Sequence, residues 1–117
     1  MIDDIYKRAK LLSQTCLKIA LVLPVEIPMC NLMRGHLIER CTDMAIKAKG
    51  LMVTQNPDFF LKKLGDAKES CDGCQYWLEL IAEEKYLDST IINPILEESV
   101  AISNLFAQAI RKIKPSY

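Results

Sequence analysis

Between Pro57 and Lys85 the chain carries an unbroken stripe of apolar residues at alternating steps of four and three residues. This spacing puts one side chain per turn on the same side of an α-helix, so the helix must pack lengthwise against neighbours. The pattern predicts one long helix over residues 57–86, with small residues in the middle of the stripe. The stripe consists of Phe60, Leu64, Ala67, Cys71, Cys74, Leu78 and Ile81.

Three further segments, residues 3–23, 28–52 and 89–114, repeat the same alternation and are predicted to be helices as well. Their stripes are Ile2, Ile5, Ala9, Leu12, Cys16, Ile19 and Leu23 in the first; Met33, Leu37, Cys41, Met44, Ala48 and Leu51 in the second; and Ile92, Ile95, Ser99, Ile102, Phe106, Ala109 and Ile113 in the last.

Polar caps and prolines mark where the later helices begin. Asn56 followed by Pro57 favours the start of the third helix, and Asp88 or Ser89 suits the start of the fourth. Pro94 lies early in the fourth segment. There it either kinks the helix or marks the point at which regular helix begins.

The length of the chain, 117 residues, is enough for a single buried core. Four amphipathic helices with short connections must neighbour one another in antiparallel order. We therefore expect an all-α fold, an up-down-up-down four-helix bundle, in which residues 1–117 form one domain.

Targeting signals and disulfide patterns are not apparent in the sequence. The first residues lack the basic and then apolar regions of a secretory signal. The longest apolar run, Ile19–Val25, is interrupted by Pro24 and is too short to span a bilayer. The five cysteines are odd in number and scattered. These features favour a cytoplasmic protein in a reducing compartment, with no membrane partner.

Cys71 and Cys74 form a single C-x-x-C pair inside the predicted third helix. A structural zinc site needs four ligands, and the sequence offers no second pair. Both cysteines fall on the apolar stripe, where cysteine acts as a small hydrophobic residue. We predict that they pack the core, with metal or redox chemistry as the alternative.

Catalytic motifs are also lacking. His36 is the only histidine, and no Gly-rich turn surrounds a nucleophile or cradles a phosphate. Tyr76 and Trp77 have the chemistry to stack on bases, but their spacing beside Leu80 is more typical of packing or interface residues. We therefore predict no catalytic residue, no metal ligand, no cofactor and no enzymatic activity.

Several apolar residues lie off the four stripes and would stay exposed on a monomer. We expect a homo-oligomer whose interface buries this second stripe. The alternative is a core wide enough to absorb these residues. The predicted interface consists of Leu17, Leu21, Tyr76, Trp77, Leu80, Leu96 and Val100.

The net charge is zero, which by itself argues against nucleic-acid binding. An up-down bundle, however, would gather ten cations at one end against only Asp3, Asp4 and Asp58. We predict this end as a phosphate-binding basic pole. Its cations are Lys7, Arg8, Lys10, Lys47, Lys49, Lys62, Lys63, Arg111, Lys112 and Lys114.

The alternative reading of this polarity is compensation of the helix dipoles, which favours cations at helix C-termini. Compensation accounts for the cations that end the second and fourth helices. It does not account for the cations in the early turns of the first and third helices, namely Lys7, Arg8, Lys10, Lys62 and Lys63.

The third helix resembles a bacterial family of four-helix bundles encoded in intervening sequences of large-subunit ribosomal RNA genes. The matching positions are Asp58-Phe59, Lys63-Leu64, Ala67, Tyr76-Trp77-Leu78-Glu79-Leu80, Tyr86-Leu87 and Ile113-Lys114. The resemblance implies a bundle that assembles into rings, typically homopentamers, without enzymatic activity. A related group of bundles serves as accessory proteins of retroelement reverse transcriptases, binding the enzyme and RNA.

Three functional hypotheses follow. The first is a non-enzymatic oligomeric adaptor that binds RNA or DNA through the basic pole, together with a protein partner such as a reverse transcriptase. The second is a purely structural or protein-binding module that does not bind nucleic acid. The third is a cysteine-based metal or redox protein.

Overall fold

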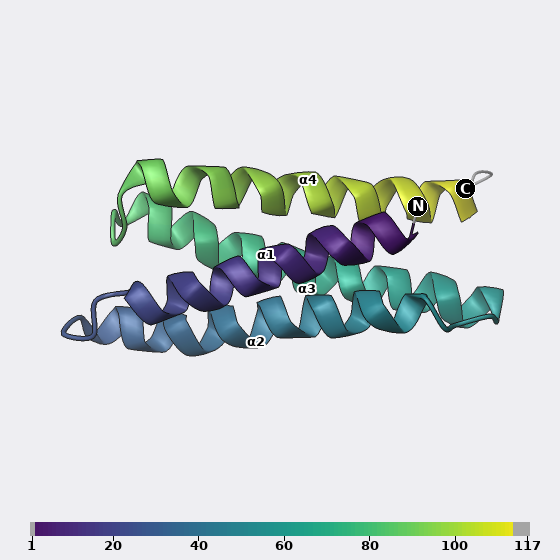
Figure 1. Cartoon of the computed structure of the whole chain (residues 1–117), viewed down its shortest axis with the longest axis horizontal. Coiled ribbons are helices and arrows are strands. Elements are labelled where there is room, and N and C mark those ends of the chain that lie inside the picture. Colours follow the sequence, from purple (N-terminus) through teal and green to yellow (C-terminus); the bar gives the residue numbers. More distant parts are fainter. Residues whose placement is uncertain (1, 114–117) are drawn as a thin grey trace.

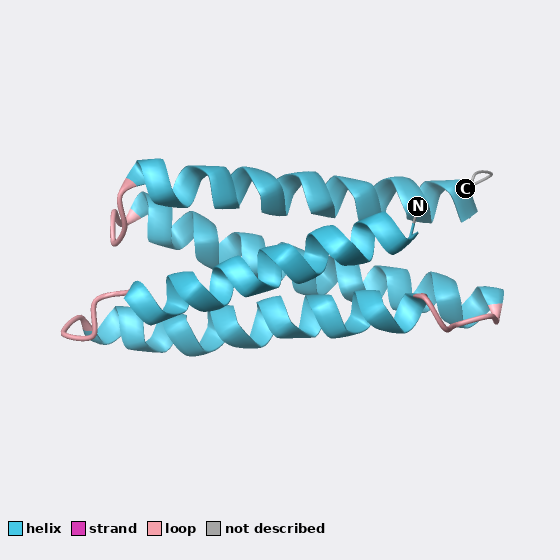
Figure 2. Cartoon of the chain, in the orientation of Figure 1, coloured by secondary structure: helices cyan, strands magenta, loops and turns pink. Residues whose placement is uncertain are grey.

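The computed structural model describes residues 2–113, and these form four α-helices connected by short turns (Figure 2). The helices are α1 (Ile2–Val22), α2 (Pro28–Leu51), α3 (Pro57–Glu83) and α4 (Ser89–Ile113). They lie along the long axis of a molecule that measures 48 × 21 × 21 Å. The prediction of an all-α fold is confirmed.

Each helix packs against two others, in the cyclic order α1, α2, α3, α4. Figure 1 shows both chain termini and the α2–α3 connection at one end of the bundle, with the other two connections at the opposite end. This is the up-down-up-down arrangement that the short connections predicted. The α1–α4 contact is the least extensive, because α1 starts beside α4 and ends beside α2 (Figure 1).

The predicted apolar stripes form the core. All of the α2 stripe and nearly all of the α1 and α3 stripes are buried. The exceptions lie toward helix ends: Ile2, Phe60 and Ile95 are only partly buried, and Ile113 is 42% exposed. Assigning Ile113 to the core was therefore wrong, because this residue of the last turn of α4 stays exposed.

The α3 helix ends at Glu83, three residues earlier than the sequence predicted. Lys85 has a φ of 56°, in the left-handed region that stops a helix. The Lys85 N–H donates to the Ala82 carbonyl at 3.2 Å, and the Tyr86 N–H donates to the Ile81 carbonyl at 3.1 Å. This pair of bonds is a Schellman motif, with a lysine in the place usually taken by glycine.

Both predicted helix starts are confirmed. The Asn56 side chain accepts hydrogen bonds from the N–H groups of Asp58 and Phe59 and so caps α3. Asp88, rather than Ser89, caps α4: its carboxylate accepts from the Thr90 N–H at 3.0 Å. The chain is already helical at Ser89 and continues through Pro94, so regular helix does not begin at Pro94.

Candidate nucleic-acid interface

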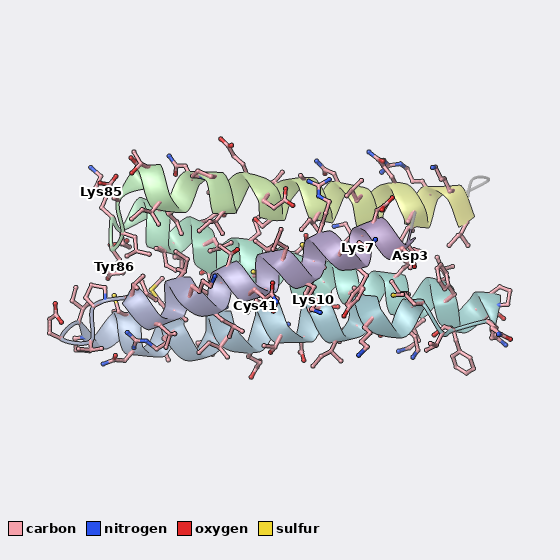
Figure 3. The ribbon with its side chains drawn as sticks, in the orientation of Figure 1. Asp3, Lys7, Lys10, Cys41, Lys85 and Tyr86 are labelled. Atoms are coloured by element: carbon pink, nitrogen blue, oxygen red, sulfur yellow. The ribbon has the colours of Figure 1, made fainter. Side chains whose placement is uncertain are left out.

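The predicted basic pole lies at the end of the bundle that holds both termini. Lys7 and Lys10 lie in the first half of α1, on the side of the molecule where Asp3 starts the helix (Figure 3). The last turns of α2 and α4 and the first turns of α3 reach the same end (Figure 1). All four helices therefore contribute cations to it.

Arg8, Lys47 and Lys62 of this set pair with carboxylates. Arg8 of α1 forms a two-pronged ion pair with Glu98 of α4, with N–O distances of 3.0 and 2.7 Å. The hydrogen bonds that Arg8 donates to the Glu98 carboxylate raise the pKa of the Arg8 guanidinium. The pair joins the two helices that contact each other least, so Arg8 stabilises the bundle rather than standing free at the pole.

The other two paired cations are lysines. Lys62 contacts Asp66, one turn along α3, at 3.3 Å. Lys47 of α2 lies 3.9 Å from Asp43 and donates a hydrogen bond of 3.0 Å to the Ser70 hydroxyl on α3. Exposed pairs of this kind are weak, and a bound anion can compete with them.

Cations that form no ion pair within residues 2–113 carry most of the charge of the pole. Lys114 lies outside the described residues. Nine described cations face six carboxylates, once Asp43, Asp66 and Glu98 join Asp3, Asp4 and Asp58. The surplus of positive charge is smaller than the sequence predicted, because Asp43, Asp66 and Glu98 also lie beside cations of the pole. The cations without an ion pair to any of residues 2–113 are Lys7, Lys10, Lys49, Lys63 and Arg111.

A shallow groove of about 330 Å³ lies between α2 and α3 at the pole. Lys63 reaches across it, so that its ammonium would lie 3.9 Å from a Cβ placed on Gly50. Lys47 lines the same groove, together with Ile46 and Asp66. The groove thus presents two ammonium groups from facing helices, an arrangement suited to an anion the size of a phosphate.

An aromatic cluster lies farther along the same α2–α3 seam. The His36 ring stacks on the Trp77 ring, with centroids 4.7 Å apart and planes inclined by 9°. The Tyr76 ring meets Trp77 edge-on at 5.2 Å. The sequence alone does not predict the contact between His36 and Trp77, because it depends on the offset between two helices.

Arg40 lies between the aromatic cluster and the groove. Its side chain runs over Gly73 of α3, where an added Cβ would come within 2.9 Å of Arg40 Cδ. Glycine at this position lets the arginine lie close to the helix. The Arg40 guanidinium forms no ion pair or hydrogen bond with any of residues 2–113, so it is available to a ligand.

The seven predicted interface residues fall into two groups. Leu17, Trp77, Leu80 and Leu96 are partly buried and pack against the core of the single chain. The others remain exposed on the outside of the helices, and the use of any of the seven in an oligomer stays a prediction. The exposed group is Leu21, Tyr76 and Val100.

The cysteines lie in the core, as predicted. Cys16, Cys41 and Cys74 come from three helices and are fully buried, with the Cys16 and Cys74 sulfurs 3.7 Å apart. Hydrogen bonds with these neighbours and burial raise the pKa of Cys16. Burial raises the pKa of Cys71 to about 12. The Cys16 and Cys71 thiols are therefore protonated, and thiols in that state are poor nucleophiles.

Within residues 2–113, no group of three or more His, Cys, Asp or Glu side chains is placed to hold a metal ion. None of the four described helices combines the length and apolar character needed to cross a membrane.

The chain is similar to a solved structure over nearly its whole length. The solved structure is that of a protein of unknown function from the S23 ribosomal protein family of Bacteroides thetaiotaomicron, with a TM-score of 0.83 over 92% of this chain and 98% of that one. The chain shares its fold. At 19% sequence identity the likeness extends no further than the fold. No family profile and no curated protein matches the chain.

Proposed function

We propose that this protein is a non-enzymatic helical adaptor that binds nucleic acid, RNA or DNA, through its basic pole. The observation that supports the proposal is the set of cations without ion pairs that all four helices bring to one end. Because the net charge of the chain is zero, this concentration reflects the placement of charge rather than its amount.

Phosphate binding at such a surface gains free energy from the release of counterions that condense on the polyanion. The pole also offers Lys47 and Lys62, whose weak ion pairs a phosphate can replace. An oligomeric ring would present several poles on one face and multiply their field. The homopentamer and the protein partner implied by the family resemblance are part of this proposal.

Assembly is supported by apolar side chains on the outside of the single chain. Leu21 is 77% exposed, and Val100 lies exposed on α4. Light scattering measures the mass in solution directly. The proposal expects a multiple of the 13.3 kDa chain, whereas a stable monomer would contradict the oligomeric part of it.

The binding proposal is tested with the double variant Lys7→Glu/Lys10→Glu and a fluorescently labelled 20-nucleotide RNA in low salt. Both lysines are exposed on the outside of α1, so the variant should fold. We expect its affinity for the RNA to fall by more than tenfold, because four units of charge change at the pole.

The matched control is Lys18→Glu/Lys85→Glu, which changes the same charge away from the pole. Lys18 lies in the second half of α1, and Lys85 lies at the α3–α4 turn (Figure 3). Its affinity should fall much less than that of the pole variant. Equal losses in the two variants, or no binding by the unaltered protein in low salt, would overturn the proposal.

A second candidate function is a purely protein-binding module. It is favoured by exposed apolar side chains around the α1–α2 connection, far from the pole. If the unaltered protein binds no nucleic acid in low salt, this function becomes the better account. The exposed side chains are Leu21, Val22, Val25, Met29 and Leu32.

A further inference from the structure

We infer that the outer seam between α2 and α3 binds a single strand of nucleic acid, with bases on the His36–Trp77 aromatic cluster and phosphates on Arg40, Lys47 and Lys63. This inference rests on the proposed function and names its ligand class and path. Tyr76 and Trp77 would then contact the bound strand, whereas the sequence predicted that they form the subunit interface.

The aromatic end of the seam is already arranged for stacking. His36 is exposed and lies nearly parallel to Trp77, so one ring face of His36 is covered and the other is open to a ligand. Tyr76, 53% exposed, extends the same surface. A base that stacks on His36 would continue the stack into Trp77, and stacking of this kind tolerates any base.

Arg40 comes next along the seam, one turn of α2 after His36. Its guanidinium has no partner among residues 2–113 and is held over α3 by the space at Gly73. A planar guanidinium binds a phosphate with two parallel hydrogen bonds. It can therefore hold the phosphate next to a base stacked on His36.

Lys47 and Lys63 complete the seam at the α2–α3 groove of the pole. Asp43 and Asp66 lie beside this groove, and each is already engaged by a lysine: Asp43 by Lys47 and Asp66 by Lys62. The seam thus leads from an aromatic surface into a cationic groove, the combination found in proteins that bind single strands.

The length of the seam suits a short run of stacked nucleotides. From His36 to Gly50 the α2 helix rises about 21 Å at 1.5 Å per residue. That distance accommodates roughly six phosphates at the 3.4 Å spacing of a stacked strand. In a duplex the bases are paired and stacked with one another, so they are not free to stack on His36. The seam therefore favours single strands over duplexes.

Trp77 is the only tryptophan in the chain, which makes its fluorescence a direct reporter on the seam. We expect single-stranded RNA and DNA 12-mers of the same sequence to quench Trp77 fluorescence as they bind. A 12-base-pair duplex should bind at the pole with little quenching. Anisotropy of a labelled strand measures binding independently of the seam.

Two exposed or partly exposed positions give variants that should fold. His36→Ala is expected to weaken single-strand binding about tenfold and to leave duplex binding unchanged. Arg40→Gln is expected to reduce the slope of log affinity against log salt by about 0.7, the value for one phosphate on a single strand. Lys18→Gln, on α1 and outside the seam, is the control for loss of one charge and should change little.

The outcomes separate this inference from the proposed function. Binding of single strands by anisotropy, with unchanged Trp77 fluorescence and no effect of His36→Ala, would overturn the seam and leave the basic pole intact. Absence of binding by the unaltered protein in low salt would overturn both.

Discussion

At the scale of single residues, the two glycines within α3 have different surroundings. A Cβ added at Gly65 would meet no atom within 4 Å, whereas one at Gly73 would meet the Arg40 side chain. Neither glycine has a positive φ. Gly65 thus leaves a helix position without a side chain and gains no contact, while Gly73 makes room for Arg40.

Gly65→Ala should raise the free energy of unfolding by about 0.5–1 kcal/mol, because alanine loses less backbone entropy in a helix. Gly73→Ala should not lower stability by much, since the arginine side chain can move, but it should weaken oligonucleotide binding by displacing Arg40. Urea unfolding measures the stability of both variants, and the anisotropy of a labelled oligonucleotide measures binding by Gly73→Ala. A loss of stability in Gly65→Ala would contradict the packing described for α3.

Lys85→Gly should stabilise the protein by about 0.5–1 kcal/mol, because a left-handed φ is less favourable for lysine than for glycine. Lys85→Ala is the matched control, since alanine keeps the unfavourable φ and should give no gain. Thermal unfolding distinguishes the two variants. Equal melting temperatures for them would show that the α3 end does not depend on the left-handed residue.

The cap of α4 should make stability depend on pH. Hydrogen bonds from the Thr90 N–H and hydroxyl lower the pKa of Asp88 in the folded state. Its contribution is therefore present above the unfolded pKa of about 3.9 and is lost as the pH falls through the lower folded pKa. Asp88→Ala should lower the melting temperature at pH 7, and the difference should shrink below pH 4.

Asp88→Asn is the control for this effect, because asparagine caps a helix without titrating. It should retain most of the stability at pH 7 and show a weaker dependence on acid than the unaltered protein. A pH-independent difference between Asp88→Ala and the unaltered protein would contradict the role given to the carboxylate.

At the scale of elements, the C-terminal end of α1 is completed by a side chain from α2. The last turn of α1 contains no basic residue. Arg34 instead donates from Nε to the Ala20 carbonyl at 2.7 Å and from Nη2 to the Leu23 carbonyl at 2.6 Å. Arg34 also donates from Nη1 to Asn31 Oδ1 at 2.6 Å, which fixes the orientation of the guanidinium. The arginine thereby satisfies carbonyl groups that the helix end leaves open.

Arg34→Met should lower the free energy of unfolding by about 2 kcal/mol, because hydrogen bonds from a charged group are lost while the aliphatic packing is kept. Arg34→Lys keeps the charge but cannot bond both carbonyls, so it should recover less than half of the loss. Urea unfolding of the three proteins gives the comparison. Full recovery by lysine would mean that charge alone is sufficient.

The elements themselves were predictable from the sequence, because alternating apolar steps define both the helices and their buried faces. The end of α3 was not, because a lysine took the left-handed position that glycine usually marks. Contacts between helices, such as Arg8 with Glu98 and His36 with Trp77, were also missed. They depend on the rotation and offset of neighbouring helices, which the spacing within one helix does not specify.

At the scale of the whole molecule, the bundle separates charge along its 48 Å length although its net charge is zero. Antiparallel order places cations of all four helices at one end. Ion pairs such as Lys62 with Asp66 reduce the surplus there but leave several cations unpaired. Long-range attraction of a polyanion should therefore be strong in low salt and weak at high salt.

The central claim, that this end binds nucleic acid through its cations, is tested most directly by the salt dependence of affinity for a single-stranded RNA. With three to five phosphates neutralised, log affinity should fall linearly with log salt, with a slope of about −2 to −3.5. Lys7→Glu/Lys10→Glu should make the slope shallower. An affinity that does not change with salt, or no binding at the lowest salt concentration, would contradict the account.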